Sequence, residues 1–302
     1  MSQPADTKYT IMVFQGLQNL PLLAAQANGF FTSRGLDVDI KIAPHSVELR
    51  NGTIEGRYHI IHSTSDNAVT LADAAGADVA ILMGGDNGFT RLCVQPEITS
   101  YADLRGRTIL VDAVDTGFTF QILEILQRNG VSRDEIRFNP VGATPRRLEG
   151  LLRDKNNAAA MLFPPFSLYA QQAGLRDMGP AVRVAGPYQS TVAYALRSWI
   201  RANETTLVKH LAAYVEGQRW ALDPKNKADA IGLYTDWLKV PQEIAHGCYD
   251  VFQSGAAEDA ALDMDGFANV LAMRARHLGV PVKPAEAYID REPYPKALGQ
   301  LS

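Results

Sequence analysis

The sequence predicts an α/β protein with two sheets, each mostly parallel and flanked by helices. Apolar segments typical of buried strands alternate with helical periodicity over the first 85 residues, and the alternation begins again after residue 95. Such alternation is typical of βαβ units. Size is the third observation, because 302 residues, 46% of them apolar, are enough for two domains with a core each.

The first series of elements is expected to contain four strands and three helices. The strands are predicted at residues 10–16, 36–43, 58–63 and 78–85. The helices are predicted at residues 20–35, 47–56 and 66–76, the first of them with breaks at Gly29 and Gly35.

The second series is predicted to contain strands at residues 102–113, 134–142 and 157–165, with helices at 116–131 and 143–154. A strand at 189–200 then precedes an almost entirely helical tail. Apolar residues recur at helical spacing through 205–222, 231–238 and 265–279.

No linker rich in Pro, Gly or Ser separates the two series. We therefore expect the lobes to be joined by strands that cross between them, near residues 90–96 and again near 187–194. Lobe one is then discontinuous, with residues 1–94 and 190–302. Lobe two holds residues 95–189.

Charge and composition exclude several classes of function. The net charge is −4 and no run of Lys or Arg is present, so no nucleic-acid partner is expected. No apolar stretch predicts membrane insertion, and the first ten residues lack the pattern of a signal peptide. The protein is expected to be cytoplasmic if Met1 is the native start, and periplasmic if an export signal has been removed.

The sequence contains no motif that predicts a cofactor or a metal. The chain has no phosphate-binding P-loop, no dinucleotide fingerprint, no H-E-x-x-H and no G-x-S-x-G. Its six histidines are scattered without ligand spacing. Cys93 and Cys248 stand among apolar residues, where a buried free thiol is the common case.

A ligand of an open α/β sheet binds beyond the carboxyl ends of the strands. Six loops follow predicted strand ends here, at residues 16–19, 62–67, 84–88, 112–117, 142–147 and 163–166. The candidate ligand-binding residues on or beside these loops of lobe one are Gln15, Gln18, Asn19, His62, Ser63, Asp66, Asn67 and Asp86. Those of lobe two are Asp112, Asp115, Thr116, Phe118, Thr144, Arg146, Phe163 and Tyr188.

Several lobe-one candidates have an equally simple structural role. Asn19 either caps the following helix or meets the ligand, and Asp66 or Ser65 is a natural N-cap. His62 ends its strand on the cleft side if the alternation of its neighbours holds. It is then either a hydrogen-bonding structural residue or an acid or base that Asp66 orients.

Lobe two offers a helix start at Thr116 with Phe118 as an apolar wall. Asp112 and Asp115, together with the lobe-one pair Asp66 and Asp86, surround the cleft with carboxylates unless some of them are helix caps. Such a cleft favours a cationic or hydrogen-bond-donating ligand over nitrate or a simple sulfonate.

The helix start after Thr144 brings two arginines. Arg146 or Arg147 turns inward to pair with a carboxylate, or both lie on a solvated face. Phe163 and Tyr188 complete the expected site as hydrophobic cover.

The order of these segments resembles the solute-binding proteins of the nitrate, sulfonate, taurine and thiamine-pyrimidine-precursor class. The resemblance rests on LPLLAAQANGFFTSRGLDVDI, GTIEGRYHIIHSTSDN, ITSYADLRGRTILVD with a following DTG, VGATPRRLEGL and AAAMLFPPFSLYAQQAG. It implies a two-lobed type II periplasmic-binding-protein fold with a ligand cleft between the lobes.

Two functions follow from this resemblance. In the first, the lobes close on a small organic ligand and present it to an ABC permease. In the second, the same fold serves as a cytoplasmic enzyme, such as a decarboxylase, dehydratase, lyase or hydrolase acting on a small cyclic or aromatic substrate. The acid and base are then His62 with Asp66, or Asp112 with Asp115.

Overall fold

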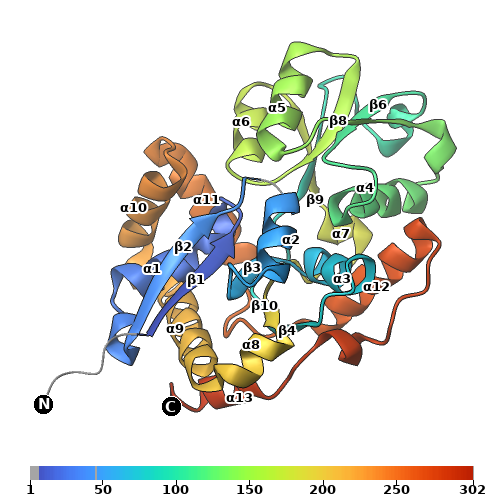
Figure 1. The fold of residues 1–302 in the computed structure, drawn as a ribbon. Helices are drawn as coiled ribbons and strands as arrows, with labels where there is room; N and C mark the ends of the chain where they lie inside the picture. Colours follow the sequence, from blue (N-terminus) through green and yellow to red (C-terminus); the bar gives the residue numbers. More distant parts are fainter. Residues whose placement is uncertain (1–6, 45, 302) are drawn as a thin grey trace, which may run out of the picture. The chain divides into compact units, whose positions relative to one another are not determined.

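The computed structural model describes residues 7–44 and 46–301, which form two compact units. Unit 1 holds the chain up to Asp86, the segment Gln189–Asp263 and the chain from Lys283 onward; unit 2 holds Asn87–Tyr188 and Met264–Val282. The tail is thus not confined to lobe one, because residues 264–282 group with unit 2. Figure 1 traces the chain through both units.

Unit 1 is built on a five-stranded sheet of order β2-β1-β3-β10-β4. Its strands are β1 (Thr7–Val13), β2 (Leu36–Ile42), β3 (Ile60–Thr64), β4 (Val79–Met83) and β10 (Thr191–Leu196). β1 pairs in parallel with β2 and β3, whereas β10 runs antiparallel to β3 and β4. β10 is the strand that enters unit 1 directly after the chain leaves unit 2.

Eight α-helices of unit 1 accompany this sheet in the described chain. They are α1 (Leu20–Ala27), α2 (Ser46–Ile54), α3 (Ser65–Ala74), α8 (Arg197–Ala202), α9 (Glu204–Leu222), α10 (Lys227–Leu238), α11 (Gln242–Gly255) and α13 (Pro293–Leu298). α1 packs directly on α9. The contact is so close that a Cβ on Gly217 of α9 would lie 2.1 Å from the carbonyl oxygen of Pro21. Only glycine fits this position.

Unit 2 repeats the plan with a sheet of order β7-β6-β8-β5-β9. Its strands are β5 (Arg91–Val94), β6 (Thr108–Val111), β7 (Arg137–Pro140), β8 (Asn157–Leu162) and β9 (Arg176–Pro180). β6 is parallel to β7 and β8, and β5 runs antiparallel to β8 and β9. β5 corresponds to β10, since it follows the first passage of the chain between the units.

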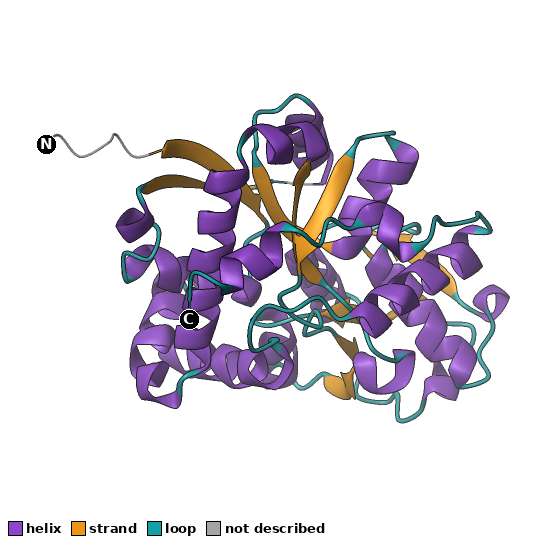
Figure 2. Ribbon diagram, turned by 90° about the horizontal axis from the view of Figure 1, so that it is seen from below, coloured by secondary structure: helices purple, strands orange, loops and turns teal. Residues whose placement is uncertain are grey.

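The helices of unit 2 are α4 (Gly117–Arg128), α5 (Thr144–Arg153), α6 (Phe166–Gln172), α7 (Val182–Ala185) and α12 (Met264–Leu278). α5 and α6 pack on the sheet, and α4 contacts α7 and α12. The helices are drawn in purple and the strands in orange in Figure 2. Two alternating series therefore give two sheets flanked by helices, which is the predicted fold class.

α12 joins unit 2 through the buried carboxylate of Glu124 on α4. That carboxylate accepts hydrogen bonds from Arg128 Nε, at 2.7 Å, and from Arg276 Nη1 of α12. The imidazole of His277 stacks on Phe120 of α4. These side-chain contacts, which link residues about 150 positions apart, explain why the tail was misplaced from the sequence.

Two of the differences from the expected elements concern β10 and β9. The strand expected at 189–200 ends at Leu196, and Arg197 begins α8. β9 was not predicted because its sequence, RDMGP, contains glycine, proline and a single apolar residue. It forms as an edge strand because β5 offers it backbone hydrogen-bonding partners.

Candidate functional site

Three helices of unit 2 begin directly beyond the carboxyl ends of neighbouring strands. α4 follows β6, α5 follows β7 and α6 follows β8, and these strands are adjacent in the sheet. The N-cap residues Thr116, Ala143 and Pro165 make no side-chain capping hydrogen bond. Helix starts and strand ends thus gather at one edge of the unit 2 sheet, where open α/β sheets bind ligands.

A buried ion pair lies at this edge. Nη1 of Arg147, a residue that is 1% exposed, is 3.4 Å from Asp112 Oδ1, and its Nη2 donates to Thr144 Oγ1 at 2.7 Å. Thr116 Oγ1 donates to the same Asp112 oxygen at 2.7 Å. We call Asp112, Thr116, Thr144 and Arg147 the strand-end cluster. It joins the ends of β6 and β7 to the starts of α4 and α5.

The electrostatics of the cluster depend on unequal burial of its two charges. Burial lowers the pKa of the Arg147 guanidinium, and the Asp112 carboxylate opposes this shift. The side chain of Asp112 is 26% exposed, so the carboxylate is accessible while the guanidinium is not. Arg147 Nε is buried without a hydrogen-bond partner in the described chain. The cluster therefore offers an accessible acceptor, and its charge is balanced internally.

Aromatic rings adjoin the cluster. Arg147 Cζ lies 5.6 Å from the centre of the Phe118 ring, and Phe118 is 6.2 Å from Phe163, centroid to centroid. Phe163 in turn meets Phe166 edge-on. Phe118 and Phe163 are both half-buried, so part of each ring is available to an apolar group.

The structure selects Arg147, and not Arg146, as the inward arginine. Arg146 is exposed, whereas the buried positions of α5 are Thr144, Arg147, Leu148 and Leu151. This i, i+3, i+4, i+7 spacing was visible in the sequence and places Arg147 on the apolar stripe. The helical phase was thus the signal that would have identified it.

Arg146 instead borders a surface groove of about 490 Å³, whose other lining residues are Val141, Glu149, Gly150, Arg153, Asp154 and Asn157. The groove is bordered by the Arg153–Glu149 pair, whose side chains are 77% and 61% exposed. Such exposed pairs contribute little energy and fix little geometry. The buried strand-end cluster is the better-built candidate. Asp115 is exposed and takes no part in it.

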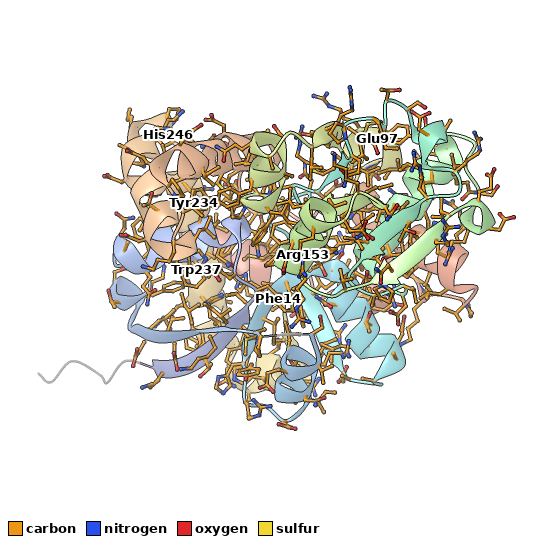
Figure 3. All side chains as sticks on the ribbon, turned by 90° about the horizontal axis from the view of Figure 1, so that it is seen from above. Phe14, Glu97, Arg153, Tyr234, Trp237 and His246 are labelled. Carbon is orange, nitrogen blue, oxygen red and sulfur yellow. The ribbon has the colours of Figure 1, made fainter. Side chains whose placement is uncertain are left out.

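In unit 1 the side-chain amides of the loop after β1 donate hydrogen bonds to backbone carbonyls. Gln18 and Asn19 both donate to the Phe14 carbonyl, and Gln15 donates to the carbonyl of Trp237 on α10. Tyr234 and Trp237 are seen on their helix in Figure 3, where Phe14 is also labelled. Asn19 occupies the N-cap position of α1 without a capping bond, and its Oδ1 is buried without a partner in the described chain.

The loop after β3 is capped one residue earlier than expected. Thr64, not Ser65 or Asp66, is the N-cap of α3, because it keeps the extended backbone of β3 and accepts from the Asn67 amide at 3.4 Å. Ser63 Oγ pairs with Tyr194 Oη at 3.0 Å. Asp66 is buried next to this cap.

Of the two roles left open for His62, the structure agrees with that of a hydrogen-bonding structural residue. It is 1% exposed, its Nε2 lies 2.9 Å from His210 Nε2 of α9, and its ring stacks on Tyr214. His210 Nδ1 in turn pairs with Tyr9 Oη at 2.8 Å. The face of β3 that carries His62 is covered by α9, so the imidazole belongs to the core. Burial lowers its pKa to about 3, which is unsuited to acid-base work near neutral pH.

The remaining predicted residues are also interior. Asp86 is buried, and its Oδ1 accepts from the Thr191 amide at 3.5 Å. Tyr188, at the end of the unit 2 segment, is 2% exposed. Of the four carboxylates expected around the site, Asp66 and Asp86 are therefore buried. Asp112 is partly exposed and paired with Arg147, and Asp115 is exposed.

Neither a metal-binding group nor a membrane-spanning helix is present in the part of the chain that the structure describes. No group of three His, Cys, Asp or Glu side chains is placed to hold a metal ion. No helix has the length and apolar character needed to cross a bilayer. Cys93 and Cys248 are unpaired and buried, and burial raises the pKa of each thiol to about 12.

Comparison with known proteins places the chain in a family. The profile of the family described as NMT1/THI5 like matches residues 17–228, more than two thirds of the sequence. The chain belongs to the NMT1/THI5-like family. A search among curated proteins finds no match.

Solved structures with the same fold include both binding proteins and an enzyme. The ligand binding component of an ABC-type import system from Staphylococcus aureus, with zinc bound, has a TM-score of 0.82 at 8% identity, over 97% of this chain and 99% of that one. The periplasmic aliphatic sulphonate binding protein SsuA from Escherichia coli has a TM-score of 0.78 at 16% identity, over 96% and 93%.

The third structure is the desulfurization enzyme DSZB, with a TM-score of 0.70 at 17% identity, over 97% of this chain and 100% of that one. The fold class predicted from the sequence, a periplasmic-binding-protein-like fold, is confirmed by these similarities. At such identities the similarity concerns the fold alone.

Proposed function

We propose that this protein binds one small organic molecule at the strand ends of unit 2, as the substrate-binding component of an ABC importer. The observation that carries the proposal is the strand-end cluster. Its buried Arg147 holds the Asp112 carboxylate in place beside two helix starts and two aromatic rings. A side chain fixed on rigid elements in this way loses little entropy when it binds a ligand.

The ligand that suits this cluster is polar, with hydrogen-bond-donating or cationic groups, and has a flat apolar part. Asp112 is an accessible acceptor. Phe118 and Phe163 supply an apolar surface for a ring. The positive charge of Arg147 is already balanced by Asp112, so a simple anion has less to gain here.

Family membership and the fold support a role in import, and we propose a periplasmic location for this role. The Staphylococcus aureus protein described above is named as a component of an ABC-type import system, and SsuA is named as periplasmic. A catalytic role has weaker support from the side chains. His62 pairs with His210 in the core, and Asp112 is held by Arg147.

The test is a thermal-shift screen of small amines, pyrimidines, aromatic acids and sulfonates. We expect one compound to raise the melting temperature, because a ligand that binds only the folded state stabilises it by mass action. Recovery of this compound unchanged after long incubation is expected. A screen in which only simple anions bind contradicts the proposed ligand class, and conversion of the compound contradicts a purely binding role.

Calorimetry on two variants then tests the site. Asp112→Asn removes the charge of the acceptor, and we expect about a tenfold loss of affinity or more, as for a hydrogen bond to a charged group. Glu149→Gln is the matched control, since it neutralises an exposed carboxylate of α5 outside the cluster. Equal affinities for the two variants would show that the cluster is not the binding site.

A further inference from the structure

The chain passes between the two units four times, at residues 86/87, 188/189, 263/264 and 282/283. Three of these passages meet at a single side chain of unit 1, that of Gln189. No sequence pattern marks this residue.

Gln189 is 2% exposed and uses both ends of its amide. Its Nε2 donates to the carbonyl of Asp86 at 3.3 Å and to that of Thr191 at 2.8 Å. Its Oε1 accepts from the Asp263 amide at 2.7 Å. Asp86, Gln189 and Asp263 are the unit 1 residues at the first three passages. One buried amide therefore ties together three segments that are distant in sequence.

Neighbouring contacts reinforce this tie. The Ser190 amide donates to the Asp86 carbonyl at 2.9 Å, and Ser65 Oγ donates to the Gln189 carbonyl at 2.6 Å. A Cβ on Gly84 would lie 2.8 Å from Gln189 Oε1 and 2.3 Å from the Ala261 carbonyl oxygen. The space around the amide is thus closed by backbone, which leaves Gln189 little freedom to move.

The unit 2 side of the same passages has a different character. Gly88, just after the first passage, has φ +89°. Gly186, just before the second, has φ +90°, but Asn269 Nδ2 donates to the carbonyls on either side of it, those of Ala185 and Pro187, at 3.1 and 2.8 Å. Glycine accepts such angles without a steric penalty and changes φ and ψ more freely than other residues. Hinges are formed by a few residues of this kind that absorb large changes in backbone angle.

We propose that Gln189 makes the unit 1 ends of three passages one rigid block, so that any rotation of the chain at the first passage occurs beyond this block, at Gly88. Gln189 is a positioning residue in this account and touches no ligand. The inference depends on the proposed function in one respect only, namely that a rearrangement of the units would serve to close them on a ligand. It is tested on the ligand-free protein, so its failure would leave the binding proposal untouched.

The first test is hydrogen exchange of Gln189→Ala against Gln95→Ala. Gln95 is a matched control, because it is also 2% exposed and donates Nε2 to two backbone carbonyls, those of Leu151 and Asn157, within unit 2. We expect the Asp263 amide to exchange about fivefold faster or more in Gln189→Ala, as for the loss of one hydrogen bond, and to be unchanged in Gln95→Ala.

The second test measures the distance between the units by spin labels on Arg153→Cys and Glu292→Cys. These side chains are 77% and 84% exposed, and the native thiols are buried, so labelling is selective. We expect Gln189→Ala to broaden the distance distribution and Gln95→Ala to leave it as in the parent. Gln189→Glu, which keeps the acceptor for Asp263 but not the donor for Asp86, should broaden it too. Equal widths in all variants that fold would overturn the proposal.

Discussion

Acid should destabilise unit 1 through its buried histidine pair. The folded-state pKa of His62 is lowered by burial to about 3, whereas the unfolded chain has an ordinary imidazole pKa of 6.5. Below pH 6.5 the unfolded state therefore binds a proton that the folded state excludes, and stability falls continuously from there toward pH 3. Between pH 7 and pH 5 the expected loss from His62 is about 2 kcal/mol. His210, whose pKa is lowered by burial and by His62, adds a loss of the same sign.

The assay is urea unfolding at pH 7 and pH 5, with linear extrapolation of the free energy of unfolding. His62→Gln keeps a polar end facing His210 and removes the titrating ring, so the drop between the two pH values should shrink by about 2 kcal/mol. His246→Asn, which removes an exposed ring labelled in Figure 3, is the control variant. The reasoning is refuted if the drop for His62→Gln equals that of the parent protein.

Two further predictions concern packing and the placement of α12. Gly217→Ala should lower the free energy of unfolding by about 3 kcal/mol, since its Cβ would meet the backbone of α1. Gly232→Ala is the control, because a Cβ at this helical position would have no neighbouring atom within 4 Å. It should be neutral or stabilising in the same unfolding assay. Glu124→Gln should weaken the bond to Arg276 and speed hydrogen exchange in α12 by about tenfold, as for loss of a charged hydrogen bond. Unchanged exchange in α12 would show that Glu124 does not hold it.

The sequence was a good guide to elements whose stability is local. Strands such as β4 and β8 are short apolar runs between turn residues, and α4 and α5 show clear helical periodicity. β9 could not be predicted from the sequence, because this edge strand forms only where β5 offers backbone hydrogen-bonding partners. The placement of α12 was also missed, because side chains distant in sequence decide it.

The sequence by itself determined the fold class, the family resemblance and the loops at the strand ends, because apolar periodicity and turn residues act over short distances. Only the tertiary structure decided which side chains at those loops are available. It turned His62 toward His210 under α9, paired Asp112 with Arg147 and left Arg146 in solvent. The physical reason is that the burial of a polar side chain depends on what packs over it, and that partner usually comes from a remote part of the chain.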